Sequence, residues 1–390
     1  MIQAFDARVI VCCGPGGVGK TTTAAALGLA LAASGRRVAV VTIDPARRLA
    51  QALGLDSLGN NPTPVPLASD ATAGGGLWAL MLDTRATFDG LVTRYAPSPE
   101  QAERILANTF YRNIAGTLSG TQEYMAMEKL YELVHAPVDD TGTAIPLFDC
   151  VIVDTPPTRN AIEFITAPER LTRFLDNRVF RALTAPARTG LRVVGVATQA
   201  VLRSLGRVVG GEVIADAIAF FQAFEGMEAG FRERAQDVLR LLRDDGSTWV
   251  IVTSPRAESA AEATLFAQQL ADQGISVRAI VANRMQPSFD PLPPLDSQDE
   301  SLRPAIVRAQ MINSTAGAHV HVIEPLLEFV RSTTLGEVAY LSVPLQPVDV
   351  HDMTGLADIG AALLADARMP EPVVTSASSR TRARRSGTAR

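Results

Sequence analysis

The residues with the plainest chemical role form one glycine-rich run near the start of the chain. Its spacing, G-x-x-x-x-G-K-T, lets successive backbone N–H groups turn inward around a phosphate, and a following helix directs its positive end to the same point. In such a loop the lysine reaches the β- and γ-phosphates of ATP and the threonine hydroxyl binds Mg²⁺. The predicted phosphate-binding residues are Gly14, Gly16, Gly17, Val18, Gly19, Lys20, Thr21 and Thr22.

The surroundings of this run separate it from an ordinary glycine-rich turn. It follows an apolar stretch ending at Cys13 and opens a second one, TTTAAALGLALAASG, that favours a helix. Strand, loop and helix in this order are the context that a phosphate loop requires. Lys20 is also one of only two lysines, with Lys129, among 36 basic residues.

Two aspartates end predicted strands and are placed to act on the phosphates. Asp44, in TIDPARR, is predicted to orient the attacking water, since phosphoryl transfer depends on positioning and charge stabilisation. The alternative is that Asp44 caps a helix beginning near Ala46. Asp154 ends the apolar run CVIV and is predicted to hold Mg²⁺, directly or through water. The predicted catalytic residues are thus Lys20, Asp44 and Asp154, and the predicted metal ligands are Thr21 and Asp154.

The elements that position these residues alternate along the chain. Short apolar runs without alternation, typical of parallel strands covered on both faces, recur between helical patterns. The predicted strands are Val9–Cys13, Val38–Ile43, Leu77–Leu82, Cys150–Val153, Trp249–Thr253, Ser276–Ala282 and Val338–Val343. The predicted helices among them are Lys20–Ser34, Arg85–Ala96 and Glu258–Gln273. This pattern predicts an α/β fold with a doubly wound, mostly parallel sheet, and the phosphate-binding run places it among P-loop NTPases.

Two long stretches have helical patterns and no convincing strand. We predict that they build a helical subdomain, from about 84–145 and 159–245, within a single ATPase domain over 1–369. The segments Gly59–Gly76 and Pro287–Asp299 are rich in Pro, Gly and Asp and predict surface loops.

The last residues, 370–390, form a basic tail with five arginines. They have little to bury, so we predict that they are disordered.

Composition excludes several classes of protein. The net charge is −5 despite the basic tail, so the rest of the chain is acidic and we expect no nucleic-acid partner. Three cysteines without a CxxC pair argue against a disulfide framework and fit a reducing cytoplasm. No run approaches the ~18 apolar residues of a membrane-spanning helix, and the start lacks the basic region of a signal peptide. We therefore expect a cytoplasmic protein without an integral membrane segment.

Five segments together carry a family resemblance: GPGGVGKTT, TIDPARRL, SGTQEYMAMEKL, FDCVIVDTPPT and VANR. They resemble the deviant-Walker ATPases, and among these the arsenite-pump and tail-anchored-protein-targeting ATPase family, especially its actinobacterial-type members with a single phosphate loop. The likeness covers most of residues 8–345. It implies an ATP- and Mg²⁺-dependent dimer that binds nucleotide at the subunit interface and switches between open and closed states. It also implies that Asn283 reads adenine and that Pro344 flanks the base.

Pro15 departs from this family pattern. The family has a signature lysine here that crosses the dimer interface to the partner's phosphates, whereas proline has neither charge nor N–H. Arg47 and Arg48 are candidate substitutes, although we favour the alternative that they form a solvated helix face. We predict a heterodimer with a paralogous subunit that supplies its own lysine, and a homodimer is the alternative.

The cysteines and histidines do not support a metalloid or zinc site. Arsenite needs several converging thiolates, whereas Cys12 and Cys13 are strand neighbours that point to opposite faces. We predict that these two and Cys150 are buried in the core. The zinc-clamping CxxC of eukaryotic targeting factors is absent, and His319 and His321 are predicted to be structural or exposed.

Two apolar series are candidates for a groove that holds a hydrophobic protein client. They are Phe220–Met227 and the set Met125, Met127, Leu130 and Leu133. At helical spacing such stripes are more often ordinary core, and this alternative is favoured.

The leading prediction is therefore an ATPase whose nucleotide cycle gates binding of a protein partner or client. One alternative is a weakly or non-hydrolysing regulatory subunit of a heterodimeric ATPase, which Pro15 favours. Another is a membrane-surface positioning ATPase that makes peripheral contact through its tail. The tail has almost no large apolar residues, which argues against this third function.

Overall fold

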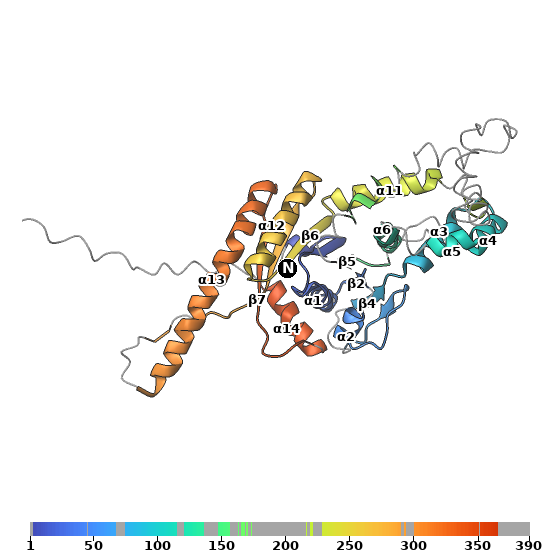
Figure 1. Ribbon diagram of the computed structural model, residues 1–390. Helices are drawn as coiled ribbons and strands as arrows, with labels where there is room; N and C mark the ends of the chain where they lie inside the picture. Colours follow the sequence, from blue (N-terminus) through green and yellow to red (C-terminus); the bar gives the residue numbers. More distant parts are fainter. Residues whose placement is uncertain are drawn as a thin grey trace, which may run out of the picture.

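A sheet of eight strands forms the centre of the described part of the chain in the computed structural model (Figure 1). The structure describes residues 3–44, 46–67, 75–114, 121–135, 147–156, 228–289, 300–350 and 352–365, with 163, 165–167, 169–170, 173, 216, 219–220 and 292–293. The predicted tail, 370–390, lies outside the described residues.

The strands are β1 (Val9–Cys13), β2 (Arg37–Thr42), β3 (Thr63–Pro64), β4 (Gly76–Met81), β5 (Cys150–Asp154), β6 (Ser247–Thr253), β7 (Val277–Met285) and β8 (Ala339–Pro344). Their order is β3-β4-β2-β5-β1-β6-β7-β8, and all neighbours are parallel except β3 and β4. Every residue of β1 and β5 is buried, which explains their unbroken apolar character. The seven predicted strands and the predicted fold class are confirmed.

The predicted loop Gly59–Gly76 is wrong in its first half and at its last residue. Thr63 and Pro64 form the short edge strand β3, antiparallel to β4, and Gly76 already belongs to β4. Proline suits such an edge because it lacks the N–H that a central strand would have to donate.

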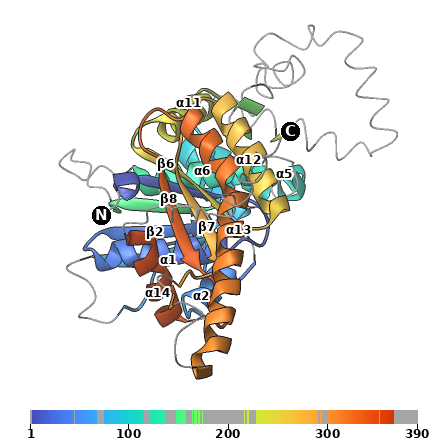
Figure 2. The same cartoon turned by 90° about the vertical axis from the view of Figure 1, so that its left-hand side faces the viewer.

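Helices cover both faces of the sheet and give three layers (Figures 1 and 2). One face carries α1 (Lys20–Ala33), α2 (Arg48–Ala52) and α14 (Met353–Leu364). The other carries α3 (Thr84–Tyr95), α4 (Pro99–Ala107), α5 (Thr109–Ile114), α6 (Thr121–Val134), α11 (Glu228–Arg243), α12 (Ala257–Asp272) and α13 (Arg303–Thr333). Along β1, Ile10 and Cys12 face the core between the sheet and α1, whereas Val9, Val11 and Cys13 face the core on the opposite side of the sheet. The side-chain alternation of β1 thus joins both cores at the strand that leads into the glycine-rich run.

The three predicted helices are confirmed as α1, α3 and α12, each within a residue or two of its expected ends. The sequence predicted neither α14 nor the 31-residue α13, whose N-terminal half projects beyond the sheet (Figure 2). The helical subdomain stays a prediction, since 136–146 and most of 157–227 lie outside the described residues. Its described helices α3, α4, α6 and α11 share one continuous core with the sheet.

Candidate functional site

The glycine-rich run connects the end of β1 to the start of α1, at the carboxyl edge of the sheet. Gly14 has a φ of 142°, and a β-carbon there would lie 2.0 Å from the carbonyl oxygen of Val252 on β6. Gly19, with a φ of 97°, is the N-cap of α1. The other predicted loop residues differ in exposure: Gly16 and Gly17 are exposed, Thr22 is partly buried and Val18 is buried. The exposed glycines leave the backbone of the loop open to a ligand.

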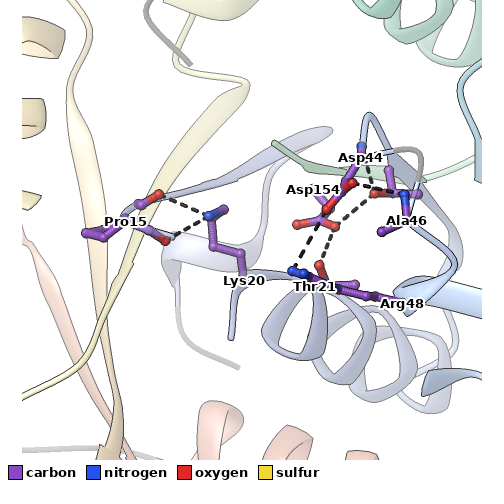
Figure 3. Close-up of polar contacts among 9 residues, drawn as sticks. Pro15, Lys20, Thr21, Asp44, Ala46, Arg48 and Asp154 are labelled. Carbon is purple, nitrogen blue, oxygen red and sulfur yellow. Dashed lines mark hydrogen bonds and ion pairs between the residues drawn. The ribbon is translucent and has the colours of Figure 1, made fainter. Parts of the chain in front are cut away.

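The Lys20 side chain folds back over the loop. Its ammonium donates to the carbonyl oxygens of Gly14 (3.1 Å) and Pro15 (2.9 Å), on the side away from Thr21 (Figure 3). Burial lowers the pKa of this ammonium, and the Asp154 carboxylate offsets part of the effect. Lys20 is therefore a largely desolvated cation, held over the loop by backbone carbonyls that a phosphate oxygen can replace.

Asp154 lies at the end of β5, fully buried, and faces the first turn of α1. Its Oδ2 accepts hydrogen bonds from the hydroxyls of Thr21 (2.8 Å) and Thr42 (3.0 Å), whereas its Oδ1 has no partner among the described residues. Burial raises the pKa of the Asp154 carboxyl to about 6, although both hydroxyl bonds lower it. A carboxylate and a hydroxyl in contact, with one carboxylate oxygen unused, fit the oxygen ligands that Mg²⁺ prefers.

Asp44 follows β2 at the same edge of the sheet, with its side chain 30% exposed. Its Oδ1 accepts from the N–H of Ala46 (2.9 Å), and Arg48 lies 4.0 Å from its Oδ2. This bond closes the turn before α2, but α2 begins at Arg48 and its N-cap residue is Arg47, so Asp44 is not the helix cap that the alternative expected. Arg47 and Arg48 are exposed, which agrees with a solvated helix face.

Asn283 and Pro344 lie on adjacent strands, β7 and β8. The amide of Asn283 donates to the Val18 carbonyl of the loop (2.7 Å), so the structure brings this distant residue into the site. Pro344 lies one strand further out, on β8, where it pairs with Met285 and is exposed.

Three residues at this edge were missed by the sequence analysis. The Thr42 hydroxyl lies between the two aspartates, the Thr155 hydroxyl donates to the Cys12 carbonyl (2.9 Å), and the Gln122 amide donates to the Ile43 carbonyl (3.0 Å). Thr42 and Thr155 each lie within two residues of a predicted catalytic aspartate, and that proximity was the available signal.

Comparison with known proteins agrees with this geometry. Residues 7–292, well over half of the chain, match the family described as anion-transporting ATPase. The chain belongs to the anion-transporting ATPase family. The loop, the two aspartates and Asn283 all lie within the matched region.

Several curated proteins resemble this anion-transporting ATPase family member. ATPase GET3 of Malassezia globosa is 26% identical over 295 residues, which are 75% of this chain and 76% of that protein. ATPase ARSA1 of Chlamydomonas reinhardtii is 25% identical over 73% of this chain, and Protein Rv2184c of Mycobacterium tuberculosis is 32% identical over 44% of it. The chain spans only 35% and 40% of the length of these last two relatives.

The three thiols of this anion-transporting ATPase family member are buried, as predicted. Cys12 and Cys13 face different cores, and burial raises the pKa of each thiol, that of Cys150 to about 12. Within the described residues, no three His, Cys, Asp or Glu side chains are arranged to hold a metal ion. His321 is exposed beside Glu324, and His319 accepts from a backbone N–H.

The candidate client groove finds no support in α6. Met125, Met127, Leu130 and Leu133 are all buried in the core, which confirms the alternative interpretation. Phe220 is buried as well, and Phe221–Met227 lie outside the described residues. Across the described part of the chain, no helix is both long and apolar enough to cross a membrane.

Proposed function

We propose that this chain is a Mg²⁺-dependent ATPase that works as a dimer and whose nucleotide cycle gates binding of a protein partner or client. The observation that carries the proposal is the contact between Thr21 and Asp154 (2.8 Å) beside a phosphate loop, with Asp44 at the end of the neighbouring strand. These are the groups that phosphoryl transfer needs: a cradle, a metal-binding pair and a carboxylate that positions water.

Each residue has a distinct task in this proposal. The loop amides and Lys20 bind the phosphates, and the ammonium exchanges two backbone carbonyls for phosphate oxygens. Thr21 and Asp154 would hold Mg²⁺, which supplies positive charge to the phosphate oxygens. Asp44 orients the attacking water, and its partial exposure leaves room for one. Asn283 and Pro344 serve the base end of the nucleotide.

The dimer is proposed from the family and from Pro15. Pro15 is buried and supplies only its carbonyl, to Lys20, so it offers no cation to a partner's phosphates. We propose a heterodimer with a paralogous subunit that brings its own lysine. The three buried thiols fit a reducing compartment, and we propose that the complex acts in the cytoplasm.

Pro15 also favours a second function, a weakly hydrolysing regulatory subunit that binds nucleotide and completes a partner's site. Single-turnover hydrolysis separates the two. The ATPase proposal expects release of phosphate by the chain, alone or faster with a paralogue. The regulatory proposal expects bound nucleotide to stay intact at this chain's site, both in the chain alone and in its mixture with a paralogue. Capture of partners from native lysate, with the protein held in its ATP state, would identify the client.

A further inference from the structure

We propose that Thr42 is a positioning residue that fixes Asp44 and Asp154 relative to each other. The inference rests on the proposed ATPase function and assigns a task to a residue outside the predicted site. It starts from one hydroxyl that touches both aspartates.

Thr42 is the last residue of β2, with only 1% of its surface exposed. Its hydroxyl donates to Oδ2 of Asp154 (3.0 Å) and lies 3.3 Å from the backbone N–H of Asp44, which donates to it. A hydroxyl has one proton to donate and two lone pairs to accept with, so both bonds form at the same time. The side chain of one aspartate and the backbone of the other are thus joined through a single oxygen.

The backbone around Thr42 strengthens this connection. Thr42 is paired with Asp154 in the parallel register of β2 and β5, and the N–H of Ile43 donates to the Asp154 carbonyl (3.2 Å). Asp154 is therefore bonded to this strand end through its main chain and its side chain. A rotation of the Asp154 carboxylate would displace the Thr42 hydroxyl. Because the oxygen of this hydroxyl accepts from the Asp44 N–H, the backbone of Asp44 would lose its acceptor.

The same hydroxyl sets how Asp154 presents its second oxygen. Thr21 and Thr42 both donate to Oδ2, so the carboxylate plane is fixed from two sides and Oδ1 is left for another ligand. Removal of the Thr42 hydroxyl leaves Oδ2 with one donor and the Asp44 N–H without this acceptor. Loss of a hydrogen bond to a charged group corresponds to roughly ten- to hundredfold in an equilibrium.

Thr42→Val tests the proposal because valine keeps the buried shape and removes the hydroxyl, and Thr42→Ser restores the hydroxyl. Thr248→Val is the matched control, since Thr248 is also a buried threonine in a central strand, at the far end of β6. ADP affinity is measured by calorimetry in EDTA and in Mg²⁺, and single-turnover hydrolysis of ATP is measured alongside.

We expect Thr42→Val to lose about tenfold of the Mg²⁺-dependent gain in ADP affinity and at least about tenfold of the hydrolysis rate. Its affinity in EDTA should stay within about twofold of the wild type, and Thr42→Ser should recover most of both losses. Thr42→Ala, with the same expectations, replaces Thr42→Val if the valine variant does not fold.

Two results would overturn the inference alone: a Thr42→Val variant that matches Thr248→Val, or a loss that Thr42→Ser does not restore. A wild-type chain that binds no ADP in either condition would overturn the proposed function, and the role of Thr42 with it. A wild-type chain that binds Mg²⁺-ADP while Thr42→Val, Thr42→Ser and Thr248→Val behave alike would overturn only the role of Thr42.

Discussion

The side-chain amide of Asn283 donates to the backbone carbonyl of Val18 across 2.7 Å, although the two residues are 265 positions apart. The Asn283 Oδ1 in turn accepts from the N–H of Arg284 (2.9 Å). Arg284 has a φ of 62°, the one positive value among the non-glycine residues that the structure describes. One side chain thus connects the end of β7 to the phosphate loop and holds a strained neighbour in place.

Asn283→Ala should lower the free energy of unfolding by about 1 kcal/mol or more and weaken Mg²⁺-ATP binding, because the Val18 carbonyl loses a donor next to the loop. Urea unfolding and calorimetry would measure the two effects. Asn283→Asp is the informative comparison, since it keeps the acceptor for Arg284 and loses the donor for Val18. Full stability and affinity in Asn283→Asp would show that the bond to Val18 is dispensable.

Lys20→Ala should abolish stabilisation by nucleotide, since we propose that the desolvated ammonium of Lys20 binds the phosphates. At 100 times its dissociation constant, a ligand raises stability by about 2.7 kcal/mol, which is readily seen as a shift in Tm. Lys129→Met is the control, because Lys129 is the only other lysine, is buried and pairs with Glu132. A Lys20→Ala protein that gains as much Tm from Mg²⁺-ATP as the wild type would contradict the phosphate-loop assignment.

Gly14→Ala should destabilise the fold by about 2–4 kcal/mol, because a β-carbon would meet the Val252 carbonyl at 2.0 Å and the φ of 142° disfavours side chains. Gly54 also has a positive φ, of 67°, but open space around it, so Gly54→Ala should cost only about 1–2 kcal/mol. Denaturant midpoints of the two variants would check this. Equal losses would mean that the close approach to β6 is unimportant.

Two aspartates, Asp154 and Asp149, should make the stability of the fold depend on pH in opposite directions. The pKa of Asp154 is raised to about 6 by burial, so its protonated form stabilises the metal-free fold below about pH 4, and this contribution is lost as pH rises through about 6. In EDTA, the free energy of unfolding of the wild type should therefore fall by up to about 3 kcal/mol between pH 4 and pH 7 relative to that of Asp154→Asn, whose side chain does not titrate. A difference that stays constant over this range would contradict the buried environment of Asp154.

Asp149 is the matched control at the opposite end of β5. A hydrogen bond from Arg37 lowers its pKa, so its contribution is present above the usual pKa of an aspartate and is lost as the pH falls. Asp149→Asn should lower stability at neutral pH by less than about 1 kcal/mol, because both partners are 41% exposed.

Pro15→Lys tests the proposed heterodimer. A lysine at this position would give a homodimer the cation that proline cannot supply. Removal of one group that stabilises transition-state charge typically lowers rates by about 100-fold or more. We expect ATP hydrolysis by the isolated chain to rise in Pro15→Lys and not in Pro15→Gln, as measured by steady-state phosphate release. High turnover in the wild-type homodimer would contradict the need for a second lysine.

Local signals account for what the sequence predicted well. The loop from Gly14 to Thr21, the strands and the aspartates at strand ends depend on residues close together in the chain, so spacing and periodicity suffice. Long-range relationships were beyond this kind of inference. Thr42 meets Asp154 only through the register of β2 and β5, and Asn283 meets Val18 only through the order of the strands.

The helix α13 escaped prediction for a different reason. Pro325 lies inside it, and a proline normally marks the end of a helical pattern. The burial of Val320, Ile323 and Leu326 against the sheet continues the helix through that point. Tertiary packing thus overrides a local signal that would otherwise end the helix.

The burial of Cys12, Cys13 and Cys150 has a practical consequence. Maleimides and iodoacetamides react with exposed thiolates, and each of these thiols is shielded and has a raised pKa. A single cysteine introduced on an exposed position, such as Met311 on α13, would therefore be labelled selectively without removal of the native thiols. The chain is therefore suited to site-specific fluorescence or spin-label measurements of the proposed nucleotide cycle.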